Sequence, residues 1–407
     1  MSPALRSGAD VLLGRMRSPE NAAGEHMTPY LRAANVGDGE LILDDIKTMN
    51  FSPSEQLRYA LEPGDVLVTE GSGSRSTVGA SAAWVGSPSP MMFQNTLLRL
   101  RARPHVEPRF LYWWSRHAFV SGLYAEASQG LAIWHLGGER VRALSFDPPE
   151  RTEQRRIADF LNDQVNRLDR AIALGHRQLE LTDQASISEM TSALIGEEEV
   201  RVPIRWLGAR VTTGPFGTVL AASEYVDGGV PIINPSHIRD GRLHPSHTET
   251  IPRHVADRLR RHRLGSGDLV VSRKGDIGRS ALVNDQADGW ICGSDSIAIQ
   301  LGHARIRPRF LQALLRLPVS REQLLQRSIG ATMPSLNEGN LLGLRIPDVS
   351  QDEQEAREKA ASRLDKENMR LRGLLTAREA VLQERKQALI TAAVTGQFDV
   401  TTARGVA

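Results

Sequence analysis

The chain has very little cysteine, and its apolar residues never form a long run. Its one cysteine among 407 residues, Cys292, excludes an internal disulfide and a cysteine-rich zinc site. No apolar stretch approaches the roughly 20 residues that a membrane-spanning helix needs. The opening residues lack the layout of a signal peptide. We therefore expect a protein of the reducing cytoplasm that has no contact with a membrane.

The charged residues are nearly balanced in number but unevenly placed. The chain has 50 Lys and Arg against 48 Asp and Glu. Residues 201–348 hold 20 basic and 13 acidic side chains, a net of +7, whereas residues 1–150 hold 14 and 16, a net of −2. Most of the basic residues in 201–348 are arginines, whose planar fork suits phosphates and guanine edges. A merely solvated basic surface is the alternative interpretation.

The sequence repeats itself at an offset of about 200 residues. Three pairs of segments keep the same order: PRFLYWW and PRFLQALL from Pro108 and Pro308, FDPPERTEQ and IPDVSQDEQ ending at Gln154 and Gln354, and GDVLVTE and GDLVVSR from Gly64 and Gly267. Each half has short β-type runs bounded by Gly-Asp turns, then a glycine-rich loop and a helix that begins at Pro-Arg-Phe-Leu. Both halves should therefore share one fold.

Each half is expected to end in a long helix, over roughly residues 151–195 and 352–395. Apolar residues recur at steps of three, four and seven, the period of a coiled-coil seam. The seams consist of Leu161, Val165, Leu168, Ile172 and Leu179, and of Leu364, Asn368, Leu371, Leu375, Leu382 and Leu389. About 45 residues give a rod of roughly 65 Å. Two such helices should pack on each other, although each packing on its own domain is the alternative.

The segments PPERTEQRRIADFL, GPFGTVLAASEYVDGGVPIINPSHIRDGRL and KQALITAAVTGQF resemble the specificity subunit of type I restriction–modification enzymes. The repeated order of recognition domain and long helix matches that family over nearly the whole chain. Two departures stand out. The first half has no counterpart of GPFGT, and the second helix begins QDEQEAREKAA without the family's Arg-Ile after Glu-Gln.

The resemblance implies an α+β fold, in which two pseudo-repeated target-recognition domains of mixed α/β type are separated by two long helices that pair as an antiparallel coiled coil. Residues 1–150 and 201–348 are then the recognition domains. Residues 151–200 and 349–407 are the spacer helices, the second with a C-terminal tail. The two domains differ at most aligned positions, which implies an asymmetric bipartite target rather than a palindrome.

The resemblance also implies a non-catalytic subunit that reads double-stranded DNA and positions two methyltransferase subunits for adenine-N6 methylation. S-adenosylmethionine is then bound by those partners, and this chain needs no cofactor. Whether restriction subunits with translocase and nuclease activity join the complex stays open. A repeat scaffold that binds proteins, and an enzyme fragment with its own methyltransferase or nuclease activity, are the alternatives.

The motifs that could suggest catalysis are incomplete. NPSH at Asn234 lacks the third and fourth residues of an amino-methyltransferase loop, so it is expected to be a turn. EGSGSRSTVG lacks the Gly-Lys-Ser/Thr ending of a phosphate-binding loop. The eleven histidines show no metal-ligand spacing. The Glu-Gln pairs 153–154 and 353–354 are expected in first helical turns, where acidic groups favour the helix dipole.

The candidate DNA-binding residues lie on loops, where binding residues collect on a rigid frame. Arginine and lysine suit phosphates and guanine, and neutral polar side chains suit base edges. In the second domain the candidates are Arg273, Lys274, Arg279, Ser335 and Asn337, and in the first domain they are Arg75, Ser76, Thr77, Gln129, Trp134 and His135.

Overall fold

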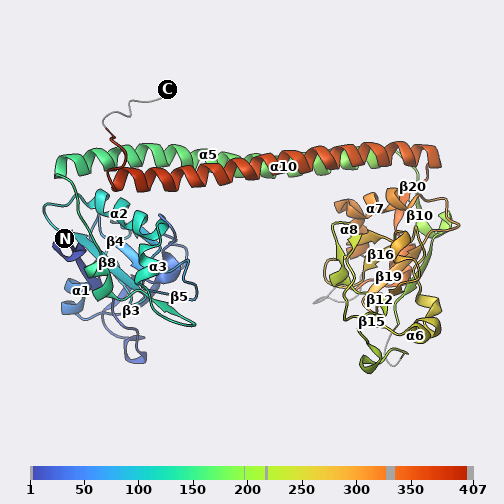
Figure 1. Cartoon of the computed structure of the whole chain (residues 1–407), viewed down its shortest axis with the longest axis horizontal. Helices are drawn as coiled ribbons and strands as arrows, with labels where there is room; N and C mark the ends of the chain where they lie inside the picture. Colours follow the sequence, from blue (N-terminus) through green and yellow to red (C-terminus); the bar gives the residue numbers. More distant parts are fainter. Residues whose placement is uncertain (1–2, 197, 216–218, 327–334, 401–407) are drawn as a thin grey trace. The chain divides into compact units, whose positions relative to one another are not determined.

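The computed structural model describes residues 3–196, 198–215, 219–326 and 335–400. Its contacts divide the chain into two compact units. Unit 1 contains residues 1–176 and 377–407, and unit 2 contains residues 177–376. Each unit therefore holds one α+β domain together with one half of each long helix, as Figure 1 shows by the sequence colours.

The two domains contain the following elements. The first has η1 (Leu5–Ser7), β1 (Ala9–Leu13), η2 (Pro19–Asn21), β2 (Met27–Leu31), η3 (Ala33–Asn35), β3 (Lys47–Asn50), α1 (Pro53–Tyr59), β4 (Val66–Thr69), β5 (Gly71–Ser72), β6 (Ser81–Ala83), β7 (Met92–Phe93), β8 (Leu97–Ala102), α2 (Pro108–Val120), α3 (Leu123–Ala127), β9 (Trp134–His135) and α4 (Gly138–Ala143). The second has β10 (Arg201–Pro203), η4 (Ile204–Leu207), β11 (Arg210–Thr213), η6 (Ala222–Glu224), β12 (Val230–Ile233), η7 (Pro235–His237), β13 (Ile238–Arg239), β14 (Arg242–Leu243), β15 (Thr250–Ile251), α6 (Arg253–Arg258), η8 (Arg260–His262), β16 (Leu269–Ser272), β17 (Ser280–Leu282), η9 (Asp285–Ala287), β18 (Ile291–Cys292), β19 (Ser296–Gln300), α7 (Pro308–Arg316), α8 (Pro318–Gln326), α9 (Glu338–Leu342) and β20 (Arg345–Pro347). The long helices are α5 (Arg151–Leu194) and α10 (Gln351–Val394).

The two domains have the same sheet topology, which confirms that the sequence repeat is a repeat of fold. A four-stranded antiparallel sheet has the order β1-β8-β4-β6 in the first domain and β11-β19-β16-β17 in the second. A smaller sheet has the order β3-β2-β7 and β15-β12-β18, with one parallel pair in each. The register also matches, since Val66 faces Leu100 and Leu269 faces Ile299.

The central strand of each larger sheet is buried on both faces. Alternate side chains of a strand point to opposite faces. Val66 and Val68 accordingly lie in the cluster under α2, whereas Leu67 lies in a second cluster on the other face. The second domain repeats this division with Leu269 and Val271 against Val270. A strand covered on both sides needs apolar residues throughout, which explains the runs VLV and LVV.

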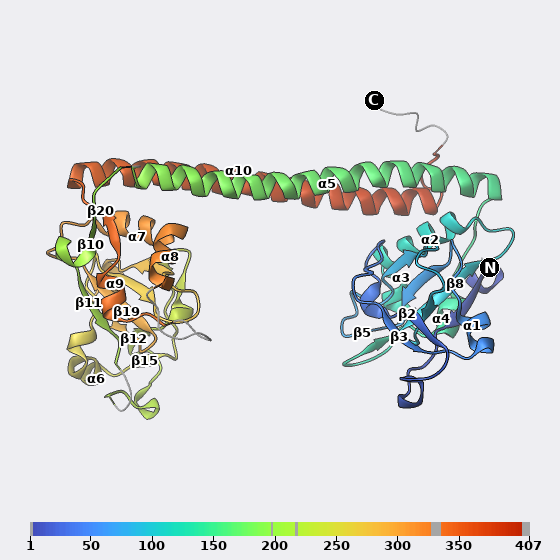
Figure 2. The ribbon, with the colours of Figure 1, turned by 180° about the vertical axis from the view of Figure 1, so that it is seen from behind.

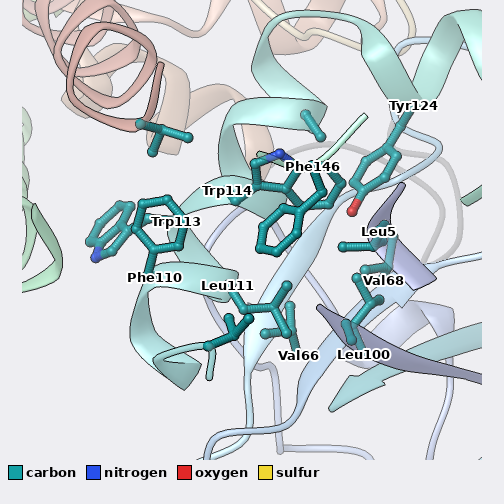
Figure 3. Close-up of a cluster of buried hydrophobic side chains, with 14 of the residues drawn as sticks. Leu5, Val66, Val68, Leu100, Phe110, Leu111, Trp113, Trp114, Tyr124 and Phe146 are labelled. Atoms are coloured by element: carbon teal, nitrogen blue, oxygen red, sulfur yellow. The ribbon is translucent and has the colours of Figure 1, made fainter. Parts of the chain in front are cut away.

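Helix α2 covers one face of the first sheet with a group of large side chains. Figure 3 shows Phe110, Trp113, Trp114, Tyr124 and Phe146 packed around the strand residues. The Trp114 ring lies edge-on to the rings of Phe146 and Tyr124, at centroid distances of 5.1 and 6.3 Å. The buried hydroxyl of Tyr124 is bonded to Ser115 at 2.9 Å. This cluster holds α2 on the sheet and forms the platform on which α5 and α10 pack.

Each long helix is tied to the preceding domain by one buried glutamine in its first turn. The Gln154 Oε1 accepts from the backbone N of Glu107 at 2.8 Å, and its Nε2 donates to the carbonyls of Pro149 and His105. Gln354 makes the same three bonds with the residues at an offset of 200, which are Arg307, Val349 and Arg305. Both glutamines are 1% exposed. The Glu-Gln pairs were expected only to favour the helix dipole, but their glutamines also join the helix start to the domain.

Helices α5 and α10 pack antiparallel, as expected (Figures 1 and 2). In unit 1, Lys386 pairs with Asp169 at 2.6 Å, and Glu379 lies 2.7 Å from the Nε2 of His176. In unit 2, Arg372 pairs with Asp183. Residue numbers fall along one helix as they rise along the other. The observed helices end within one residue of the expected ranges.

The seams of both helices contain residues as predicted. Leu161, Val165 and Ile172 of α5 and Leu375 of α10 are buried. Leu371 is 38% exposed, yet it lines one groove with Leu364 and Asn368 of α10 and with Ser186 of α5. The ends of α10 also pack on the domains. Its end supplies Ile390, Ala393 and Val394 to the first-domain core, and its beginning supplies Ala361 to the second-domain core. The expected pairing and its alternative therefore both hold.

The glutamine ties should contribute measurably to stability. We expect Gln154→Ala and Gln354→Ala each to lower the free energy of unfolding by about 1–3 kcal/mol, because each leaves buried backbone groups without partners. Chemical denaturation of the full-length chain measures this. Gln178→Ala, at an exposed position of α5, is the matched control and should stay within about 0.5 kcal/mol of the wild type. Equal effects of all three substitutions would contradict the assignment.

Glu199, in the segment that follows α5, forms an ion pair with Arg357 of α10 whose contribution to stability depends on pH. The Arg357 Nη1 donates to Glu199 Oε2 at 2.7 Å, and Glu199 also accepts from the backbone N of Gly196. The hydrogen bonds from Arg357 hold the pKa of Glu199 below its ordinary value of 4.5. A carboxyl with a lowered pKa stabilises the fold above that ordinary value. This stabilisation is lost as the pH falls through the folded-state pKa.

Replacing Glu199 should therefore matter at neutral pH and not in acid. We expect Glu199→Gln to lower the free energy of unfolding by about 1–2 kcal/mol at pH 7. The difference from the wild type should shrink steadily as the pH is lowered below 4.5. Urea titrations at a series of pH values measure both. A difference that does not depend on pH would show that the charge of Glu199 is not responsible.

Candidate nucleic-acid interface

All six candidate residues of the first domain lie on the pair of strands β5 and β9 or on the loops beside it. Strand β5 pairs antiparallel with β9, with Gly71 opposite His135 and Ser72 opposite Trp134. Gln129 forms a further bridge with His135. Arg75, Ser76 and Thr77 lie in the loop after β5. Residues about 55 positions apart in the sequence thus share one surface, which the candidate assignments required.

Arg75 is held over Trp134. The guanidinium carbon lies 5.4 Å from the centroid of the Trp134 ring, and Nε donates to the carbonyl of Ala125 at 3.2 Å. This geometry restrains the exposed arginine while leaving its Nη groups without a hydrogen-bond partner among the described residues. A restrained guanidinium with outward donors suits a phosphate or a guanine edge.

The other polar candidates of the first domain also have partners within it. The hydroxyls of Ser74 and Ser76 are 2.7 Å apart, and those of Ser72 and Thr77 are 2.6 Å apart. His135 Nδ1 lies 3.0 Å from a carboxylate oxygen of Glu70. These contacts fix the shape of the loop. Hydroxyl groups can still accept or donate a further bond.

The second domain places its candidates in a similar arrangement. Lys274 forms an isolated bridge with Ser335, the counterpart of the β5–β9 pairing. The Arg273 Nε donates to the carbonyl of Leu336 at 3.0 Å, and Lys274 Nζ lies 2.9 Å from Asp295 Oδ1. The backbone carbonyl of Arg279 accepts from Ser272, which sets Arg279 beside Arg273. Four of the five candidates, Arg273, Lys274, Arg279 and Ser335, therefore lie close together where the loop after β16 begins.

Asn337 and Arg279 have particular environments. The Asn337 Oδ1 accepts from the backbone N of Asn340 at 2.8 Å and caps α9. Part of its side chain is thus used for structure. The Nε of Arg279 is buried and has no hydrogen-bond partner among the described residues. Residues 330–334 of the loop GATMPSLN, and Phe216, Gly217 and Thr218 of GPFGT, lie outside the described residues.

A second basic surface lies on α6 and η8, and the sequence reasoning missed it. Arg253, Arg258, Arg260, Arg261 and Arg263 are exposed there. Arg258 and Arg263 pair with Glu224 and Asp257. No ion pair within the described ranges involves Arg260 or Arg261. The sequence signal was the run RHVADRLRRHR, which supplies much of the +7 balance of residues 201–348.

Two further kinds of feature, a metal-binding cluster and a membrane-spanning helix, are absent from the described part of the chain. It contains no cluster of three or more His, Cys, Asp or Glu residues able to hold a metal ion. None of its helices is both long and apolar enough to cross a membrane. The NPSH segment forms η7 behind Asn234, which confirms the expected turn. The Asn234 amide donates to Glu249 at 2.6 Å.

The chain combines two α+β domains of the same topology with two long antiparallel helices. No protein-family model matches the chain. A chain of a type I restriction–modification system, solved in work on complex assembly and conformational transition, superposes with a TM-score of 0.76 at 15% identity over 98% of both chains. The HsdS subunit of Thermoanaerobacter tengcongensis superposes with a TM-score of 0.56 at 16% identity, over 98% of this chain and 97% of that one.

A curated relative agrees with the structural comparison. The specificity subunit of the type I restriction enzyme EcoBI of Escherichia coli is 20% identical over 320 residues, which are 73% of this chain. The match spans 65% of that relative, just under two thirds of its length. The resemblance indicated by the motifs is confirmed: the chain has the fold of the specificity subunits of type I restriction–modification systems.

Proposed function

We propose that this chain is the DNA-recognition subunit of a type I restriction–modification complex. It reads an asymmetric bipartite target in double-stranded DNA, with one half-site for each domain. The observation that carries the proposal is that each domain presents a loop with basic and polar side chains on the same repeated frame. Arg75 and Trp134 stand at this place in the first domain, and Lys274 and Ser335 stand there in the second.

The two loops carry different chemistry, which is why we infer two different half-sites. The first combines an aromatic ring, a restrained arginine and hydroxyls. The second combines Lys274 with Arg273 and Arg279. Phosphate contacts position a protein on DNA, and contacts with base edges specify the sequence. Two domains with one frame and unlike loops would read two unlike half-sites.

In the proposed complex, the partner subunits carry out the methylation. Two methyltransferase subunits, one for each half of the pseudo-repeat, would bind this chain and methylate adenine N6 with S-adenosylmethionine. The chain itself would be non-catalytic and would bind no cofactor. Such a complex acts on DNA in the cytoplasm, and restriction subunits that carry translocase and nuclease activity can complete it. Paired helices of 44 residues each would set the spacing of the half-sites.

The length of the paired helices gives the central test. Insertion of seven residues at matched positions of α5 and α10 adds about 10 Å to the rod. We expect the unspecified gap between half-sites to lengthen by roughly three base pairs, at about 3.4 Å each. Mapping methylated adenines in cells that contain the chain and its methyltransferase subunit measures the gap.

The same experiment tests the function itself. The wild type should give methylated adenines in a motif of two unlike half-sites, and the methyltransferase subunit alone should give no such motif. Insertion into only one helix is the control, because it breaks the pairing and should abolish methylation. Methylation by the chain without its partner would favour an enzyme, and the absence of any DNA preference would favour a protein scaffold.

Lys274 is expected to contact a phosphate from its position beside Asp295. Lys274→Ala should weaken binding to all sequences alike and reduce the salt slope of log K by about one. Asp295→Asn is the matched variant. It removes the intramolecular partner of the lysine, 2.9 Å away, and should strengthen binding without changing the base preference.

The measurement is DNA binding by the assembled complex at two salt concentrations, with a panel of single-base variants. A change of base preference in Lys274→Ala would show that this lysine reads a base instead. Unchanged binding in both variants would show that the loop faces away from DNA.

A further inference from the structure

The hairpin formed by residues 129–135, which includes β9, carries exposed apolar side chains at its tip. Leu131 is 101% exposed and Ile133 is 56% exposed. Figures 1 and 2 show the hairpin, beside the label β5, projecting from the body of the first domain. Single exposed leucines are ordinary on protein surfaces. Two branched aliphatic side chains on one projecting turn are a feature that needs an explanation.

The turn that carries these side chains is well fixed. Gln129 and His135 exchange two backbone hydrogen bonds of 2.9 and 2.8 Å below the tip. Gly130 has φ of 155°, and a Cβ there would lie 1.9 Å from the carbonyl oxygen of Ile133. The turn therefore closes tightly through glycine. The tip would lose little conformational freedom on binding, which favours its use as a contact.

Arg140 fastens the base of the hairpin from inside the domain. Its guanidinium donates to the carbonyls of Leu136 and His135 at 2.9 and 2.8 Å, and to the side chain of Gln129 at 2.9 Å. On the neighbouring arm, Arg75 is stacked on Trp134. The apolar tip is thus flanked by a restrained guanidinium, hydroxyls and an imidazole, and these are groups that suit a phosphate backbone.

We propose that Leu131 and Ile133 contact thymine methyl groups in the major groove of the half-site read by the first domain. This inference rests on the proposed function. In the major groove the C5 methyl of thymine is an apolar feature, and proteins read it with apolar side chains. Polar groups beside an apolar tip match a groove whose methyl groups lie between two phosphate rows. A half-site that contains a methylatable adenine has at least one thymine opposite it.

Deoxyuridine provides the direct probe, because it differs from thymidine only in lacking that methyl group. The full-length chain, assembled with its methyltransferase subunits, is titrated with duplexes in which each thymine of the target is replaced in turn. For the wild type we expect a loss of affinity of roughly 3- to 10-fold at one or two positions of the first half-site, in line with a contact worth about 1 kcal/mol.

The variant Leu131→Ser/Ile133→Ser should bind the unmodified target more weakly by a similar factor. It should also lose the sensitivity to deoxyuridine at those positions, while its response in the second half-site stays unchanged. Leu57→Ser is the matched control: Leu57 is 88% exposed on α1, outside the hairpin, and its replacement should leave both affinities unaltered. Equal unfolding midpoints of the three proteins show that folding is intact.

Each of the following outcomes overturns the inference, and the results also show whether the proposed function fails with it. A variant that remains as sensitive to deoxyuridine as the wild type shows that the tip does not read methyl groups. Loss of the methyltransferase subunit from the variant, with deoxyuridine sensitivity kept, shows that the tip is a protein contact. A wild type insensitive to every replacement excludes thymine reading, although bipartite recognition would stand. Only a wild type without any sequence preference would count against the proposed function as well.

Discussion

The structure depends on the hydrogen bonds of one buried glutamine in each repeat. The side-chain amides of Gln154 and Gln354 form hydrogen bonds with backbone groups of the loop that precedes α2 or α7. They also bond to the backbone of the chain that enters the long helix. An amide buried at this place is costly without partners, so the three segments must meet in one geometry. The start of each helix is thereby fixed to its domain, and the apolar residues of α5 and α10 then complete the two domain cores.

The shared frame tolerates large changes of charge. In the first domain Arg101 makes a bidentate pair with the buried Asp65, whereas the second domain has Gln300 and Asp268 at the matching places. Burial raises the pKa of Asp268, and the hydrogen bonds that Arg101 donates to Asp65 raise the pKa of Arg101. Arg99 and Arg116 of the first domain are buried too. Both domains also have exposed arginines, such as Arg75 in the first domain and those of α6 and η8 in the second.

Much of the fold could be predicted from the sequence because its signals are periodic or repeated. The 200-residue offset predicted two like domains, and the heptad spacing predicted both long helices to within one residue. The contacts of the helix ends could not be predicted, because spacing alone does not reveal that Ile390 and Ala361 pack on domains. For the candidate interface, the repeat grouped Arg75 with Trp134 and Lys274 with Ser335. Leu131 was missed because its exposure depends on the pairing of Gln129 with His135, and so short a hairpin has no period in the sequence.

The residues that hold the fold and those proposed for recognition are largely different, although Trp134 also packs against the first-domain core. The glutamine ties, the strands covered on both faces and the helix seams include none of the candidate interface residues except through backbone bonds such as that of Arg279 to Ser272. The candidates are instead held by local contacts, with Arg75 on Trp134 and Arg273 on the carbonyl of Leu336. Substitutions at such loop positions change the surface that is offered and leave the large hydrophobic terms of folding intact. A duplicated chain built in this way can alter one recognition surface while the other domain and the helix pair keep their structure, and this separation makes two unlike half-sites compatible with a single repeated fold.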